Sequence, residues 1–275
     1  MFLHQKELQF EAKPDKPNPL IAKYLQELIG GQYGEMSVAM QYLFQGWSCR
    51  GEEKYKDMLM DIATEEIGHV EMLATMVARL LEGAPVEDQE AAMKKDPAIG
   101  AIISGMNPQH AIVAGLGPRP ADSVGNPWSG AYIIASGNLL ADFRANLNAE
   151  SQGRLQVARI YEMIDDRGIK DLLSVLLARD IYHQNLWAQA VKELEEKEGT
   201  ILVPSTFPRN EERLDIAYDF YNFSEGDQSK EGSWAKGKAL DGEGEYQWLS
   251  TPKVEGKAPK LDPVTSKMYG TPPEK

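Results

Sequence analysis

Two apolar seams, each interrupted at its centre by an acid and a histidine three residues apart, most constrain what this chain can fold into. The first seam consists of Met58, Ile62, Glu66, His69, Leu73, Met76 and Leu80. The second seam consists of Leu173, Leu176, Asp180, His183, Trp187, Ala190 and Leu194. Steps of three and four residues place each seam on one helix face, which a bundle turns towards its core. An acid buried there is costly unless something compensates its charge, so the meaning of each pair depends on its partners.

A second helical pattern with one central acid precedes each seam. The pattern before the first seam consists of Ile21, Leu25, Leu28, Gln32, Glu35, Ala39 and Tyr42. The pattern before the second seam consists of Phe143, Leu147, Glu150, Arg154, Val157 and Tyr161. Glu35 precedes Glu66 by almost the same number of residues as Glu150 precedes Asp180, so the chain contains two similar helix pairs. Four-helix bundles, ferritin-like ones among them, build carboxylate-bridged dinuclear metal sites from such parts.

Five of these residues form a ligand set that suits two hard metal ions. They are Glu35, Glu66, His69, Glu150 and His183. Carboxylates with imidazoles suit manganese or iron, and the lack of clustered cysteines disfavours structural zinc and iron–sulfur clusters. Two divalent ions would compensate the buried carboxylates. A lone glutamate or histidine in a seam is more often a hydrogen-bonded core residue, but matched positions on four seams favour a metal site.

Asp180 departs from the symmetry of the two pairs. It stands where the other pair has Glu66 but is shorter by one methylene, so we expect it to lie beside the metal ions without binding them. Its expected role is that of a base or proton store. The structural alternative is a buried ion pair with Arg179 or Arg154. Two metals with an adjacent carboxylate suit peroxide chemistry, which needs no external reductant.

The predicted fold is all-α: a ferritin-like four-helix bundle with a long crossover. The four helices are expected over residues 19–48, 52–81, 129–163 and 169–197. Gly30, Gly31 and Gly34 weaken the first of them just before Glu35. The crossover is too long for a turn and rich in proline. It is expected over residues 84–128, with short helices around 98–106 and 109–114.

The last quarter of the chain differs in composition from the bundle. Residues 200–275 contain proline and glycine throughout and few aliphatic residues, so they cannot form a core of their own. We expect one helical patch near residues 211–220 and otherwise an extended, irregular tail. Its scattered aromatic residues favour docking, on the bundle or on a neighbouring subunit, over disorder. The expected organisation is a bundle domain over residues 1–199 and a tail over 200–275.

Composition limits the partners and the compartment. The net charge of −13 argues against nucleic acid and anionic membrane as partners. The single cysteine, Cys49, excludes an internal disulfide framework and suits a reducing compartment. The first residues lack the apolar core of a signal peptide, and no apolar run reaches membrane-spanning length. We therefore expect a soluble, cytoplasmic protein.

Several runs of the sequence are similar to the non-haem manganese catalases. They cover residues 32–36, 63–71, 153–156, 161–166 and 178–185. The resemblance extends over nearly the whole chain, and its motifs are specific. It implies a ferritin-like bundle with a dimanganese centre that converts hydrogen peroxide into water and oxygen. The residues that match the family's ligands are Glu35, Glu66, His69, Glu150 and His183.

The resemblance also implies roles around the metals. Asp180 matches the position where some members have a glutamate that accepts a proton, and Tyr42 matches a tyrosine that hydrogen-bonds near the centre. Ala149 stands where some members have an arginine that closes one side of the site.

A calcium site and a homohexamer are further implications of the resemblance. The residues that match the calcium site are Asp57, Asp61, Asn222, Ser224 and Gly226. Without the resemblance, Asp57 and Asp61 would be interpreted as part of a solvent-exposed helix face. Two aspartates one turn apart can, however, bind one calcium ion together. A hexamer in which tails wrap neighbouring subunits suits a tail without its own core.

Three functions stay open on the sequence. A manganese catalase would release oxygen from peroxide without an electron donor. A ferritin-like di-iron oxidase or iron-handling protein would depend on ferrous iron and oxygen, and would be better served by a glutamate in place of Asp180. A structural stress-layer protein would keep the bundle and little activity.

Overall fold

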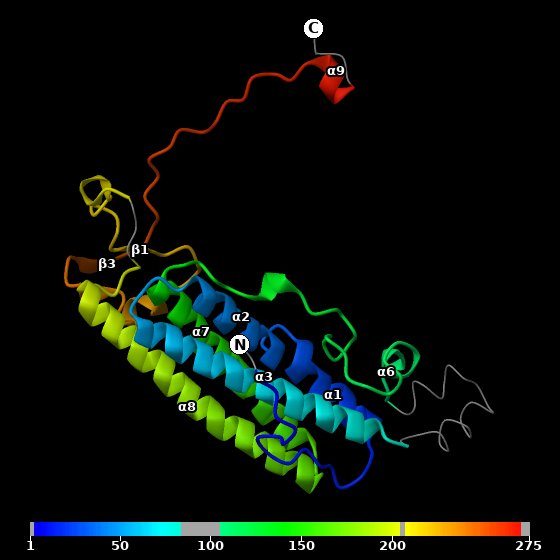
Figure 1. Cartoon of the computed structure of the whole chain (residues 1–275). Coiled ribbons are helices and arrows are strands. Elements are labelled where there is room, and N and C mark those ends of the chain that lie inside the picture. The colour runs from blue at the N-terminus through cyan, green and yellow to red at the C-terminus, as the bar shows by residue number, and fades with distance from the viewer. Residues whose placement is uncertain (1–2, 84–104, 204–206, 271–275) are drawn as a thin grey trace. The chain divides into compact units, whose positions relative to one another are not determined.

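The computed structural model describes residues 3–83, 105–203 and 207–270, and it divides into two compact units, Met1–Val203 and Pro204–Lys275. The first unit is helical (Figure 1). Its helices are α1 (Pro19–Gly30), α2 (Glu35–Ser48), α3 (Glu53–Leu81), α6 (Pro108–Ile112), α7 (Leu139–Met163) and α8 (Arg167–Glu198). None of the helices in the described residues is both long and apolar enough to cross a membrane.

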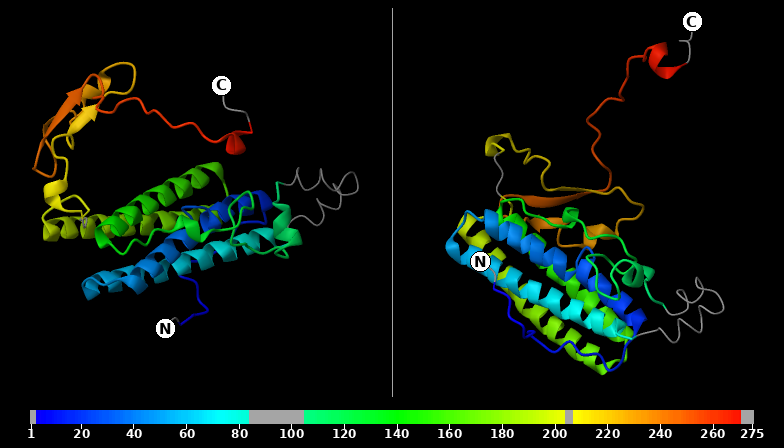
Figure 2. Two further views of the ribbon diagram at one scale, coloured as in Figure 1. Left: turned by 90° about the horizontal axis from the view of Figure 1, so that it is seen from above. Right: turned by 45° about the vertical axis from the view of Figure 1, so that its right-hand side comes forward.

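The long helices pack as two hairpins side by side. α2 lies along α3, and α7 lies along α8, while α1 packs on α3 and α2 on α7 (Figure 2). Their buried side chains form two clusters, one towards each end of the helices. Leu73 and Leu173 belong to the first cluster, and Tyr42, Phe143 and Trp187 belong to the second. The acid-and-histidine pairs of α3 and α8 lie in sequence between residues of the two clusters.

The helix expected over residues 19–48 is in fact two helices, and the prediction of one continuous helix was wrong. α1 ends at Gly30, whose added Cβ would overlap the backbone of Ala121 in the crossover. At Gly34 a Cβ would lie 2.8 Å from the carbonyl oxygens of Leu28 and Ile29. The glycines therefore allow a tight break between the helices. As a result Glu35 is the first residue of α2, where the helix dipole favours an acid.

α7 begins at Leu139, not near residue 129 as expected. Asn138 caps the helix by accepting a hydrogen bond from the backbone N–H of Ala141. The buried Asp142 accepts hydrogen bonds from the backbone N–H groups of Ser136 and Gly137, so these residues form a fixed loop. Competing side-chain hydrogen bonds of this kind end helices that the apolar pattern alone would extend.

The crossover is held against α1 by a buried amide. Gln26 donates to the carbonyl oxygens of Arg119 and Ala121, and its oxygen accepts from the Arg119 backbone N–H. α6 (Pro108–Ile112) overlaps in sequence with the short helix that was expected over residues 109–114. The other expected short helix, around 98–106, falls almost wholly outside the described residues.

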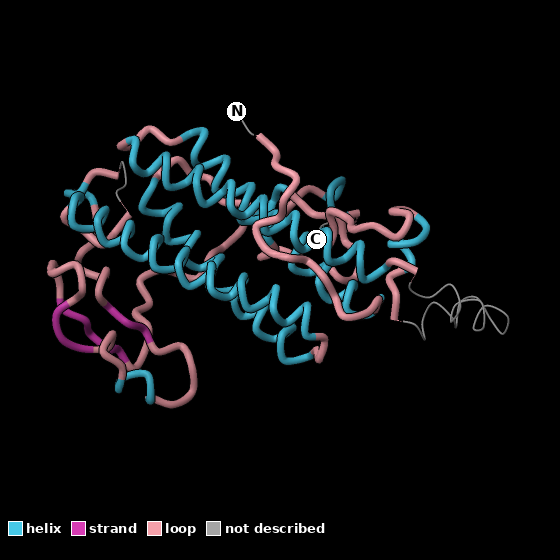
Figure 3. Tube along the Cα trace, turned by 60° about the horizontal axis from the view of Figure 1, so that its bottom comes forward, coloured by secondary structure: helices cyan, strands magenta, loops and turns pink. Residues whose placement is uncertain are grey.

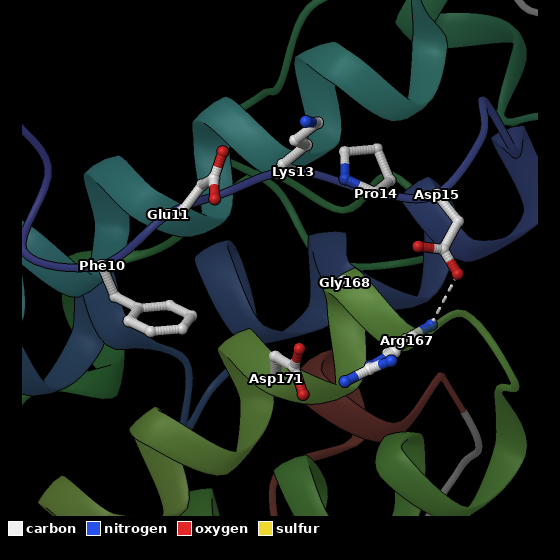
Figure 4. A pocket seen from close by; sticks show the side chains of 8 residues that line it. All are labelled: Phe10, Glu11, Lys13, Pro14, Asp15, Arg167, Gly168 and Asp171. Carbon is white, nitrogen blue, oxygen red and sulfur yellow. Dashed lines mark hydrogen bonds between the residues drawn. The ribbon is translucent and has the colours of Figure 1, made fainter.

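The N-terminal segment packs along α3 and the start of α8. Ala12 is fully buried, and its carbonyl accepts a hydrogen bond of 2.7 Å from Arg79. The carboxylate of Asp15 accepts from the Arg167 backbone N–H at 3.0 Å, drawn as a dashed line in Figure 4. A cavity of about 370 Å³ lies between this segment and α8, and none of the predicted site residues lines it.

The second unit contains a small sheet, so the prediction of an all-α chain was wrong for this part. Strands β1 (Asp219–Tyr221), β2 (Lys236–Lys238) and β3 (Glu245–Leu249) form a sheet of order β1-β3-β2, shown in magenta in Figure 3. β1 is parallel and β2 antiparallel to β3. The helical patch expected over 211–220 was also wrong, because turns and β1 occupy it. The chain as a whole is mainly helical, with this sheet and a short α9 (Ser266–Tyr269).

Candidate metal centre

The structure brings the five predicted ligands together between the two helix hairpins. Glu35 comes from α2, Glu66 and His69 from α3, Glu150 from α7, and His183 from α8. All five are buried. They form two groups, Glu35 with Glu66 and His69, and Glu66 with Glu150 and His183, in each of which the ligand atoms lie within 4.8 Å of one another. Both groups share Glu66.

Glu66 lies between the two imidazoles and offers one oxygen to each. Its Oε2 is 2.6 Å from His69 Nδ1, and its Oε1 is 2.7 Å from His183 Nδ1. The same nitrogens are each 3.8 Å from a second carboxylate, that of Glu35 for His69 and that of Glu150 for His183. The arrangement is a central carboxylate flanked by two similar carboxylate–imidazole pairs.

The hydrogen bonds of these residues leave room for metal ions. Among the residues that the structure describes, His183 Nδ1 has no hydrogen-bond partner, although Glu66 Oε1 lies 2.7 Å away. A buried nitrogen that points at carboxylates without hydrogen-bonding them is expected where a cation belongs. Three carboxylates and two imidazoles are also the donors that manganese or iron prefers. The residues therefore fit a dinuclear metal centre.

The charges of the metal-free site are strongly coupled. Burial and the negative charge of Glu66 raise the pKa of Glu35 well above its usual value, and the same two causes raise that of Glu150 to about 8. Burial would also raise the pKa of Glu66, but the two histidines hold it far below its usual range. Burial would lower the pKa of His183, but contacts with carboxylates raise it to about 10. Protons bound to these groups therefore compensate part of the negative charge of the carboxylates when no metal is bound.

Tyr42 and Trp187 fix Glu150 from behind. The Tyr42 hydroxyl donates to Glu150 Oε1 at 2.6 Å, and the Trp187 indole N–H donates to the same oxygen at 3.4 Å. Both aromatic side chains are fully buried, and their rings contact each other. Tyr42 thus hydrogen-bonds one of the five predicted ligands.

Asp180 lies beside the ligand set without joining it. It lines an enclosed cavity of about 10 Å³ together with Glu35, Glu150, Tyr33 and Ala149. The volume suits one small molecule of about the size of water. The cavity adjoins the carboxylates and is not lined by the histidines.

The ion-pair alternative for Asp180 is not what the structure shows. Arg179 pairs with Glu65, and Arg154 donates to the carbonyl oxygen of Leu177. Within the described residues, Asp180 Oδ2 is buried and has no hydrogen-bond partner. Burial and the charge of Glu66 raise the pKa of Asp180 to about 7. Asp180 thus makes no ion pair with either arginine among the described residues, although the charge of Arg154 acts to lower its pKa.

Glu65 is a site residue that the sequence reasoning missed. Its carboxylate lies behind both histidines, 3.1 Å from His183 Nε2 and 3.8 Å from His69 Nε2, and Arg179 binds it with two N–H groups. The sequence contained a pattern that could have indicated this contact. Glu65 stands four residues before His69, and Arg179 stands four residues before His183. Residues at this spacing share a helix face.

The residues predicted for calcium lie in both units. Asp57 and Asp61 are exposed on α3. Asn222, Ser224 and Gly226 follow β1 in the second unit, where the Asn222 amide donates to the Gly226 carbonyl at 2.8 Å. Neither set belongs to the two groups of metal-binding geometry described above.

Known proteins match the chain over its whole length. The family described as manganese containing catalase matches residues 1–273. The chain is 61% identical to a manganese catalase of Bacillus subtilis (strain 168) over 99% of both chains. It is 43% identical to a manganese catalase of Lactiplantibacillus plantarum over 98% of both chains. It also resembles the solved structure of KatB, a manganese catalase from Anabaena, with 29% identity and a TM-score of 0.69, covering 92% of this chain and 100% of that one. The resemblance seen in the sequence is thus confirmed, and this chain belongs to the family of manganese-containing catalases.

Proposed function

We propose that the buried carboxylates and imidazoles between the two hairpins carry the catalase reaction of this family member. The protein is an enzyme that converts hydrogen peroxide into water and oxygen with a dinuclear manganese centre. The residues that hold the two ions are Glu35, Glu66, His69, Glu150 and His183. The observation that carries the proposal is the position of Glu66, whose two oxygens each face a different histidine.

Bound manganese would supply the two-electron redox chemistry by which one hydrogen peroxide is oxidised to oxygen while another is reduced to water. The protein keeps this chemistry away from bulk water, because the five residues are buried. Glu66, whose two oxygens face different histidines, would contribute to both metal positions. Tyr42 keeps the Glu150 carboxylate in its orientation through the hydrogen bond at Oε1.

Asp180 acts on the protons of the substrate. Peroxide must lose protons when it is oxidised and gain them when it is reduced, so a nearby group has to accept and return them. Asp180 lines the cavity, is buried, and makes no ion pair with an arginine among the described residues. Ala149 lines the same cavity with a small side chain.

The assembly and the remaining sites are proposed on the family resemblance. We place the described helices in a ferritin-like four-helix bundle with a long crossover, and the tail on a neighbouring subunit of a homohexamer. The proposed calcium ligands are Asp57, Asp61, Asn222, Ser224 and Gly226. Shortening the tail in steps and titrating each protein with calcium would test this assignment. We propose no nucleic acid or membrane partner, because the chain is acidic. The single cysteine, Cys49, supports a cytoplasmic location.

The test compares two metals in the same protein. Metal-free protein is loaded with manganese or with ferrous iron, and oxygen is followed after addition of hydrogen peroxide without a reductant. The manganese form is expected to release oxygen steadily, in proportion to its metal content. Ferrous protein that consumes oxygen rapidly, beside manganese protein that releases none, would support an iron oxidase instead.

A further inference from the structure

Glu65 occupies a place that the ligand set does not explain. It lies on the side of the two histidines that faces away from Glu66, with Glu65 Oε2 3.1 Å from His183 Nε2. A surface pocket of about 550 Å³ opens over it. The pocket is lined by Gln9, Asp61, Thr64, Glu65, Gly68 and Arg179. Glu65 is therefore the carboxylate between solvent and the buried imidazoles.

The two oxygens of Glu65 are engaged differently. Oε1 accepts hydrogen bonds from Arg179 Nε at 2.5 Å and from the Gln9 amide at 2.9 Å, and it stays 3.8 Å from His69 Nε2. Oε2 accepts from Arg179 Nη2 at 3.1 Å and faces His183 Nε2 at the same distance. His69 Nε2 makes no hydrogen bond among the described residues. The carboxylate of Glu65 thus lies closer to the ring nitrogen of His183 than to that of His69.

This contact determines which nitrogen of His183 is free to bind a metal. A carboxylate only accepts hydrogen bonds, so His183 Nε2 must carry the proton that it shares with Glu65. The other nitrogen, Nδ1, then points towards Glu66, 2.7 Å from its Oε1. Hydrogen-bonded partners behind a metal-binding histidine typically change metal affinity by about 10–100-fold.

We propose that Glu65 is a positioning residue that fixes His183 with Nδ1 towards Glu66 and Glu150, and so sets the affinity of that one metal position. The proposal rests on the assignment of the five ligands above. Arg179 holds the Glu65 carboxylate from α8, and Gln9 holds it from the N-terminal segment. That segment therefore contributes to the metal centre, although it supplies no ligand.

The experiment measures manganese retention in Glu65→Gln and Glu65→Ala. Glu65→Gln keeps the side-chain size but replaces one acceptor oxygen by an NH₂ donor. Each protein, loaded with manganese, is dialysed against a series of chelator concentrations, and manganese per subunit is determined. In both variants one of the two ions is expected to leave about 10–100-fold more readily than in the wild type. The electron paramagnetic resonance spectrum should change accordingly, from a coupled pair to an isolated Mn²⁺ ion.

Glu71→Gln is the matched control. It removes a carboxylate from the same helix, one that binds the exposed His4 at 2.7 Å, and it should leave the retention curve unchanged. Retention curves of the Glu65 variants that match the wild type, or equal loss of both ions, would overturn the proposal. If circular dichroism shows that Glu65→Ala does not fold, Glu65→Gln decides. Wild-type protein that holds two ions but releases no oxygen would contradict the proposed function, while the retention curves would still test Glu65.

Discussion

Glu66 and Asp180 occupy equivalent places in two similar helix pairs, yet their surroundings are opposite. Glu66 lies between two histidines, which hold its pKa far below the usual range. Asp180 lines a small cavity, and burial raises its pKa to about 7. Asp180 is shorter than Glu66 by one methylene and belongs to neither group of metal-binding geometry. The proposed function therefore gives the two copies of the motif different roles, a shared metal ligand in one and a proton-handling acid in the other.

The residues just before these two acids also differ between the two helix pairs. Glu65 precedes Glu66, and Arg179 precedes Asp180, so the two copies carry opposite charges at equivalent positions. In the structure these two side chains bind each other at 2.5 Å. The second helix pair therefore complements the first instead of copying it.

The largest effect is expected from removing the shared carboxylate. Glu66→Ala takes one oxygen from each metal position, and it leaves His69 and His183 without their nearest carboxylate. Both ions and all measurable oxygen release should be lost together. Elemental analysis and an oxygen electrode measure the two quantities. A variant that keeps both ions would show that Glu66 is not shared by the two metal positions, and Glu66 and Asp180 would then not differ as proposed.

Asp180→Ala should separate rate from metal binding. The variant is expected to keep both ions and to lose oxygen release by about 10²–10⁴-fold, the usual contribution of a positioned acid or base. Asp171→Ala, an exposed aspartate of the same helix, should leave the rate unchanged. Loss of metal in Asp180→Ala would make this residue a ligand, and Glu66 and Asp180 would then be alike after all.

Manganese affinity should rise with pH, because binding must displace protons. In the metal-free site Glu150 has a pKa of about 8 and His183 of about 10, so both carry protons at pH 6–7. Each must release its proton to bind a metal, so the affinity should increase by about tenfold or more per pH unit up to about pH 8. Competition titrations between pH 6 and 8 measure this slope. A flat profile would mean that these two groups already lack their protons before metal binds.

The smallest effect is expected from Tyr42→Phe, which removes only the hydroxyl that donates to Glu150. Chelator-driven loss of manganese should become about tenfold easier, the lower end of the range for such partners. Tyr55→Phe is the matched control, since the Tyr55 hydroxyl lies 3.4 Å from the surface carboxylate of Glu193. Equal retention in the two variants would show that Glu150 needs no support from Tyr42.

The meeting of the five buried acids and histidines could be predicted from the sequence because these residues lie on helices. Helical spacing fixes which side chains share a face, so Glu66 and His69 lie together, as do Asp180 and His183. The break between α1 and α2 could not be predicted, because it depends on a contact with a distant residue. Gly30 ends α1 where Ala121 of the crossover approaches it, and no local pattern announces that approach.

Glu65 and the small sheet show two other limits of sequence reasoning. Glu65 lies beside the seam, and only the pairing of α3 with α8 reveals that it lies behind both histidines. Strands β1 and β2 are only three residues long, too short for an alternation of apolar and polar residues to mark them. In β3 the residues from Glu245 to Trp248 do alternate, and this short signal was missed. Both features arise from contacts between segments far apart in the chain.

The decisive measurement is oxygen release from hydrogen peroxide as a function of manganese content, without a reductant. Purified protein is stripped of metal, reloaded to different manganese contents and assayed in one series. Oxygen release should disappear with the metal, return on reloading, and follow the manganese content of each preparation. Fully loaded protein that releases no oxygen, or release that does not depend on manganese, would contradict the proposed function.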